Sequence, residues 1–190
     1  SGVLNVTTSG AITDSGTVSV TGTATFASGA SNNITLDNAN NFSTLVITTG
    51  NNVTINDINA IDLGASTVSG FLNVTAGGAI SDSGNLVITG AATFAAGCAN
   101  DVILDRAGND FSTVSIASGN NVTINDINGL NLSACSVCGN MGVTTNGAIS
   151  DSGAIVVAGT ATFSAGAAND ITLDTASNNF NSITVATAND

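Results

Sequence analysis

Internal repetition is the feature that most constrains how this chain can fold. A segment of about 69 residues recurs along the sequence, and its Asp-Ser-Gly tripeptide starts at Asp14, Asp82 and Asp151. The copies cover residues 1–68, 69–137 and 138–190, the last one truncated. Such a segment is too long for one turn of a solenoid, so each copy must contain several smaller packing units. The sequence therefore predicts one continuous repeat domain over residues 1–190.

One short segment differs in length between the copies. Residues 38–41 are one residue shorter than their counterparts, residues 106–110, whereas the flanking blocks align without gaps. Surface loops tolerate insertions better than packed elements do. We therefore predict a loop there, and in the middle copy it carries Arg106.

The composition favours an all-β structure. Val, Ile and Thr are frequent, Gly and Asn separate them, and Pro is absent. β-branched residues favour strands, Gly and Asn favour tight corners, and Pro would remove a donor from a strand ladder. Helix formers such as Lys and Glu do not occur. The residue types therefore indicate many short strands joined by tight turns.

The alternating segments within one repeat suggest the size of a coil. We count about nine of them per copy, including Leu72-Asn73-Val74, in which every second residue points inward. Grouped in threes, they give coils of roughly 23 residues with about three strands each. The predicted fold is thus a right-handed parallel β-helix, a β-solenoid.

Six phenylalanines recur at fixed places in the repeats: Phe26, Phe42, Phe94, Phe111, Phe163 and Phe180. With three coils per repeat, equivalent rings would lie about 14 Å apart, since parallel strands are spaced by about 4.8 Å. They could not stack on one another, and Ile, Leu, Val or Ala of the intervening coils would pack each ring. We expect all six to fill the core or its corners.

Several blocks resemble a known class of surface proteins. The blocks LNVTAGGAISDSG, LVITGAATFAAG and NNVTINDI are similar to the degenerate repeats of filamentous-haemagglutinin-like adhesins and other large bacterial surface proteins. The resemblance extends over the whole chain. It implies a right-handed parallel β-helix, secretion to the cell surface, and a role in adhesion or in an extracellular matrix.

The charge balance excludes two kinds of partner. The net charge is −12, and Arg106 is the only cationic side chain. Nucleic acids and anionic lipid surfaces need clusters of Lys and Arg, so we expect neither as a partner. No apolar run is long enough to span a bilayer, so we expect no membrane insertion.

Catalysis is not expected of this chain. It has no His, Lys or Tyr that could take part in proton transfer. The carboxylates nearest to a pair are those of Asp101, Asp105 and Asp110, and copy one carries Asn33 at the first of these positions. We predict no catalytic residues and no cofactor.

The same three aspartates are the candidates for calcium, which prefers carboxylate and carbonyl oxygens. None of the acidic segments matches an EF-hand loop or the Asp-containing nonapeptide repeat. Asp and Asn at turns commonly bond to nearby backbone groups instead. We expect the second role, with calcium at Asp101, Asp105 and Asp110 as the alternative.

Cysteines occur only in and beside the middle copy, as Cys98, Cys135 and Cys138. Small residues, Ala or Ser, stand at the equivalent positions of the other copies, so a thiol fits there. The chain has no second Cys pair or His to complete a zinc site. Three alternatives stay open: free buried thiols, one disulfide with an odd Cys left over, and cross-links between neighbouring molecules.

These observations favour a structural or adhesive rod on the outside of a bacterial cell, as part of a surface adhesin or fibre. Its partners would be adjoining repeats or copies of itself, joined end to end, and host or matrix glycans or proteins. One alternative is a subunit that polymerises head to tail into an extracellular filament or sheath. The other is a β-helix that binds or cleaves carbohydrate.

Overall fold

The computed structural model describes residues 2–189, and it is a single all-β solenoid; Ser1 and Asp190, which end the predicted domain, lie outside the described residues. Every strand pairing is parallel, consistent with the predicted right-handed parallel β-helix. The strands are β1 Leu4–Thr7, β2 Ile12–Thr13, β3 Ser19–Ala27, β4 Ile34–Thr49, β5 Val53–Asp57, β6 Ile61–Leu63, β7 Ser66–Val68, β8 Leu72–Ala76, β9 Ile80–Asp82, β10 Leu86–Ala95, β11 Val102–Leu104, β12 Asp110–Gly119, β13 Val122–Asp126, β14 Leu130–Val137, β15 Met141–Thr145, β16 Ile149–Asp151, β17 Ile155–Ser164, β18 Ile171–Thr172 and β19 Asn179–Thr187.

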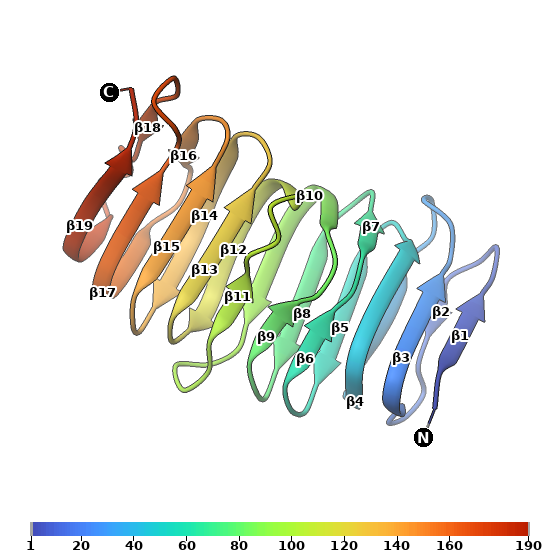
Figure 1. Cartoon of the computed structure of the whole chain (residues 1–190). Helices are drawn as coiled ribbons and strands as arrows, with labels where there is room; N and C mark the ends of the chain where they lie inside the picture. The colour runs from blue at the N-terminus through green and yellow to red at the C-terminus, as the bar shows by residue number, and fades with distance from the viewer. Residues whose placement is uncertain (1, 190) are drawn as a thin grey trace.

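Two long ladders of strands run along the solenoid and form its two main layers (Figure 1). One ladder joins β9, β11, β13, β15, β17 and β19 in this order. The other joins β5, β8, β10, β12, β14 and β16. Shorter pairings at the bends, such as β7 with β10, add a third set. The chain thus passes through each ladder once per turn.

The coil is shorter than the sequence pattern predicts. In the second ladder Leu72 pairs with Ala92, and Ala92 pairs in turn with Val114. Along its whole length the chain makes about nine turns of roughly 20 residues each. The coil length derived from three alternating segments is therefore too long, because the tight corners between the ladders use few residues.

Because the coil is shorter than predicted, equivalent residues of successive repeats lie on different layers of the solenoid. Ala92 and Ala161 occupy the same position of successive repeats, yet Ala92 lies on the ladder that continues through Val114 and Leu132 to Asp151. Ala161 lies on the other ladder, between Met141 and Ile183. One long repeat therefore contains about three and a half turns, and successive repeats present the same residues on opposite layers.

The core follows from strict alternation along the strands. In β13, Val122, Ile124 and Asp126 are buried while the residues between them point outward. Phe94 and Phe111 are fully buried, which confirms the prediction that such rings fill the core. They pack on each other edge to face, with ring centroids 6.3 Å apart, and the equivalent rings of the other repeats pair in the same way. The predicted packing by aliphatic neighbours alone is therefore incomplete.

Asparagine and glycine build the corners between the ladders. Asn52 accepts a hydrogen bond from the backbone N–H of Phe71 in the next coil, and Asn121 does the same for Asn140. At Gly84 the coils approach so closely that a Cβ atom would collide with the backbone nitrogen of Ala65. These residue types are therefore required where backbone groups of neighbouring coils meet.

The segment of variable length is a turn in two repeats only. In the middle repeat the N–H of Asn109 donates to the carbonyl of Arg106, and Asn178 and Thr175 form the same turn in the third. In the first repeat β4 continues through this position without a break. A loop is therefore confirmed for two copies, and the shorter copy replaces it with strand. Among residues 2–189 there is no helix long and apolar enough to cross a bilayer.

Candidate functional site

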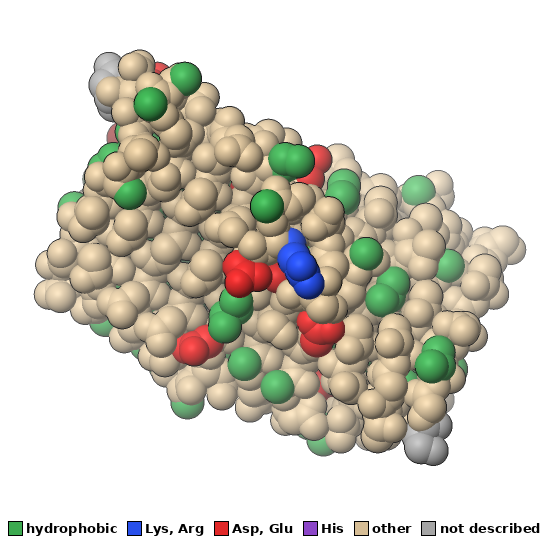
Figure 2. Space-filling view, viewed as in Figure 1, with side chains coloured by type: hydrophobic (Ala, Val, Ile, Leu, Met, Phe, Trp, Pro, Cys, Tyr) green, Lys and Arg blue, Asp and Glu red, His purple; other side chains and the backbone are tan. Residues whose placement is uncertain are grey.

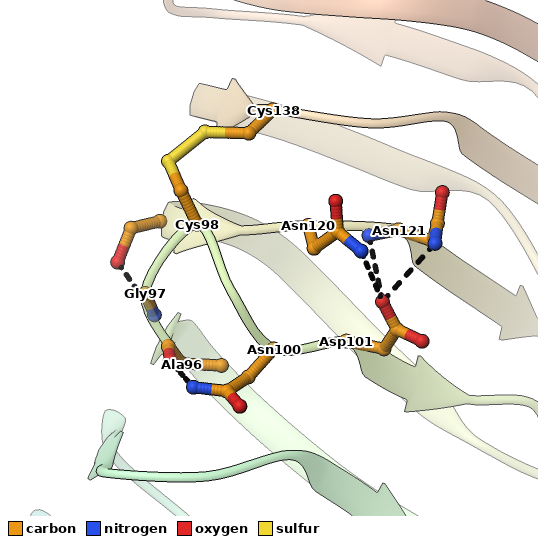
Figure 3. Close-up of a disulfide and its surroundings, with 9 residues drawn as sticks. Ala96, Gly97, Cys98, Asn100, Asp101, Asn120, Asn121 and Cys138 are labelled. Atoms are coloured by element: carbon orange, nitrogen blue, oxygen red, sulfur yellow. Dashed lines mark hydrogen bonds between the residues drawn. A yellow bond between two sulfur atoms is a disulfide. The ribbon is translucent and has the colours of Figure 1, made fainter.

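A disulfide joins two exposed turns of the solenoid. Cys98 lies in the turn after β10, and Cys138 follows the end of β14 (Figure 3). Their Cα atoms are 5.5 Å apart, although 40 residues separate them in sequence. This separation equals two coils, so the bond ties a coil to the second coil after it. Of the alternatives that the sequence left open, the structure has one disulfide and one remaining cysteine.

The first repeat makes a hydrogen bond at the equivalent place. Ser69 corresponds to Cys138 and Ala30 corresponds to Cys98. The hydroxyl of Ser69 donates to the carbonyl of Ala30 over 2.6 Å. The turn after the long strand thus reaches the second coil ahead in both copies. The disulfide is a covalent form of a contact that the fold already makes.

Cys135 is unlike the two paired cysteines. Its side chain is only 2% exposed, and it occupies an inward ladder position between Ile116 and Ile155. Burial raises the pKa of its thiol to about 11. A protonated, enclosed thiol is a poor nucleophile, so Cys135 behaves as a small core residue.

Asp101 is held by amide groups rather than left free. Its Oδ1 accepts hydrogen bonds from the side chain of Asn120 and from both the backbone and the side chain of Asn121 (Figure 3). The bond from the backbone of Asn121 is the main cause of the lowered pKa of Asp101. This carboxylate therefore closes a corner between two coils.

The other two calcium candidates serve separate turns. Asp110 accepts from the side chain of Asn128 over 2.9 Å, while the backbone N–H of Asp105 donates to Asp82. Among residues 2–189, no three acidic or cysteine side chains group closely enough to hold a metal ion. Of the three aspartates, Asp101 accepts a backbone N–H, from Asn121 of the next coil, whereas Asp110 accepts from a side chain. Calcium at these residues stays a prediction.

A buried pair of Asp and Asn is a feature that the sequence reasoning missed. Asn109 donates to Asp82 over 2.6 Å and accepts from the backbone N–H of Leu86 over 2.8 Å. Burial raises the pKa of Asp82. The same pair recurs as Asp14 with Asn40 and as Asp151 with Asn178. Its signal in the sequence is that each Asp-Ser-Gly is followed, slightly more than one coil later, by an Asn-Asn-Phe or Asn-Asp-Phe tripeptide.

Arg106 lies exposed on the turn after β11, near the middle of the face seen in Figure 2. Acidic side chains lie on both sides of it in this view. Figure 2 thus shows basic and acidic side chains close together on a face that is otherwise mostly uncharged.

Comparison with known proteins gives one match. A family model described as repeats of unknown function (DUF5649) matches residues 1–49, 50–118 and 119–187. The second and third matches each have the length of the period read from the sequence, but their boundaries lie about one coil away from ours. No curated protein and no solved structure matches the chain.

Proposed function

Since the chain belongs to this family of repeats of unknown function, we propose a function from its geometry. It is a stiff structural segment of an extracellular surface protein or fibre, and it holds an adhesive surface away from the cell. The observation that carries this proposal is the pair of uninterrupted parallel ladders, in which each inner coil is bonded to the coil before it and the coil after it.

Stiffness follows from how the coils are joined. At about 4.8 Å per coil, about nine turns make a rod of about 43 Å. Within residues 2–189, no buried side-chain nitrogen or oxygen lacks a hydrogen-bond partner. A rod with a continuous core and no unsatisfied buried side chains bends little and offers few openings to proteases.

Two observations support the extracellular and adhesive parts of the proposal. The disulfide between Cys98 and Cys138 lies on exposed turns, and such bonds persist mainly in oxidising compartments. The blocks that resemble filamentous-haemagglutinin-like repeats extend over the same coils.

Immunogold labelling of intact cells of the source organism tests the proposed location. Antibodies raised against the folded chain should label unpermeabilised cells, and external protease should remove the label. Labelling that appears only after lysis would contradict the proposal. Small-angle scattering from the purified chain tests the rod, because the scattering profile should be that of an elongated particle.

A head-to-tail filament is the second candidate. The apolar side chains of β19 are uncovered, with Ile183 50% and Val185 53% exposed, and they line a cavity together with Ile171 and Leu173. An adjoining coil, from the same protein or from another copy, would cover them. Electron microscopy separates these possibilities, because long fibres formed by the purified chain alone favour the filament and short monodisperse rods argue against it.

A further inference from the structure

The same β-bulge occurs at a bend between the two ladders in each repeat. Between the pairs Val20–Phe42 and Thr23–Thr44, the two residues Thr21 and Gly22 of β3 face a single residue, Ser43, of β4. Matching register shifts occur between β10 and β12 and between β17 and β19. The extra residue lies where the strand bends from one ladder to the other, and hollows in the surface occur at these bends.

Two of these hollows are grooves with matching linings. The first groove, of about 420 Å³, is lined by Thr21, Ser43 and Asn59, and the second, of about 440 Å³, by their counterparts Thr89, Ser112 and Asn128. Each groove crosses three successive coils. At about 4.8 Å per coil, its length along the rod is about 10 Å, enough for two rings of an extended sugar chain.

Buried aspartates fix the shape of both grooves. In the first groove, Asp57 accepts from the N–H of Phe42 in the floor over 2.6 Å and from the N–H of Asn59 in the wall over 3.0 Å. Asp126 does the same for Phe111 and Asn128 in the second groove. One carboxylate thus holds floor and wall together, and neither groove has to form when a ligand arrives.

The polar side chains along the first groove are hydroxyls and amides, which both donate and accept hydrogen bonds. The second groove has the same groups, and the carboxylate of Asp110 stands in the place of the Asn41 amide. Beside each groove the chain exposes an isoleucine at the same repeat position: Ile58 is 54% exposed and Ile127 is 48% exposed. Polar groups with an adjoining apolar surface match the hydroxyl edges and C–H faces of a sugar ring. The net charge of −12 disfavours anionic glycans.

We infer that each groove binds a short stretch of an extended, neutral polysaccharide. Because one repeat contains about three and a half turns, the two grooves lie at opposite edges of the rod, one at the bend between β5 and β6 and the other at the bend between β13 and β14. One molecule therefore binds two separate polysaccharide chains and cross-links them. On a matrix that offers many chains, binding at both sites raises the overall avidity above the affinity of either site alone. This inference rests on the proposed extracellular role, because such matrices lie outside the cell.

Titration of the intact isotope-labelled chain with cellohexaose and chitohexaose tests the inference by NMR and calorimetry. We expect shifts of backbone amides at both grooves and a stoichiometry of two sugars per chain. Asn59→Ala should remove the first site and Asn128→Ala the second, each lowering the stoichiometry to one, with at least a tenfold loss of affinity at the altered groove. Thr54→Ala, on a flat part of the layer, is the matched control and should leave both sites.

Three results would overturn the inference: no shifts with either hexasaccharide, shifts confined to other surfaces, or two sites retained in both Asn variants. Because Asn59 and Asn128 are exposed, their removal leaves the core intact, and circular dichroism of each variant verifies this. These titrations use the purified chain, so they fail or succeed independently of the immunogold experiment that tests the extracellular location.

Discussion

Glycine is required at some corners because it has no Cβ atom. Gly16, Gly84 and Gly153 occupy the same repeat position, and none has the positive φ that would itself require glycine. They differ in their surroundings: a Cβ atom at Gly84 would meet backbone of the preceding coil, whereas one at Gly16 would meet nothing within 4 Å. The requirement for glycine thus comes from coil stacking.

The first prediction compares these two positions. Gly84→Ala should lower the free energy of unfolding by about 2 kcal/mol, because the coils must separate to admit the methyl group. Gly16→Ala, its matched control, should change it by less than about 0.5 kcal/mol. Urea titrations measure both values, and equal effects of the two variants would refute the stacking argument.

The buried Asp82 gives a second prediction at this scale. Asp82→Ala leaves the side-chain amide of Asn109 and the backbone N–H of Asp105 without their acceptor. Leaving buried donors unsatisfied should cost about 3 kcal/mol or more. Asp37→Ala, at an exposed position, is the control and should be nearly neutral. A similar small loss for both variants would show that the buried pair contributes little.

At the scale of the element, the disulfide spans two coils. In the chain-entropy model, closing a loop of about 40 residues contributes about 4 kcal/mol. Cys98→Ala should therefore lower the free energy of unfolding by up to about this amount and make the stability insensitive to dithiothreitol. Cys135→Ala removes only part of a buried side chain, so the free energy of unfolding of this variant should still fall when dithiothreitol is added. If dithiothreitol changes neither the urea midpoint nor the gel mobility of the wild-type protein, the disulfide does not form.

The alternation of apolar and polar residues determined how much of the strand arrangement could be predicted from the sequence. Alternation in Val122-Thr123-Ile124 tells which side chains point inward, so strands, core and parallel coil were predictable. It does not report how many residues complete a turn, because the corners merge with the strands. Pairing of Cys98 with Cys138 needs the observed coil of roughly 20 residues, and in the longer predicted coil the two positions lie out of register. That error left the cysteine pairing open.

The Asp-Asn pairs and the grooves were hidden for a related reason. Asp82 and Asn109 are 27 residues apart, more than one turn, so only the stacking of coils brings them together. The bulge at Thr89 and Gly90 likewise exists only relative to the neighbouring strand. Sequence reasoning placed Asn109 in a loop, but it could not tell which part of the neighbouring coil that loop adjoins.

For the molecule as a whole, ionisation of buried aspartates opposes folding over part of the acidic pH range. Burial raises the pKa values of Asp57, Asp82 and Asp126. Between the ordinary pKa of 3.8 and those raised values, the folded chain binds more protons than the unfolded chain. The free energy of unfolding should therefore fall as pH rises through this window, and relief of the net charge of −12 acts in the same direction.

Urea midpoints measured from pH 7 down to about pH 4 check this prediction. The midpoint should rise as the pH falls, and it should drop again only below about pH 4, where Asp14 and Asp101, whose pKa values are lowered, become protonated. Asp126→Asn should flatten the upper part of the profile. A midpoint that falls steadily from pH 7 downward would contradict the expected sign of the effect.

One repeat contains about three and a half turns, and distances between pairs of spin labels can verify this number. In a chain whose cysteines are all replaced, labels at Thr54 and Thr93 lie on one ladder, two coils or about 10 Å apart, and should show strong dipolar broadening. Labels at Thr25 and Thr93, equivalent in sequence, lie on opposite layers and should show none. Broadening in the second pair, as expected for three whole turns and about 14 Å, would contradict the account.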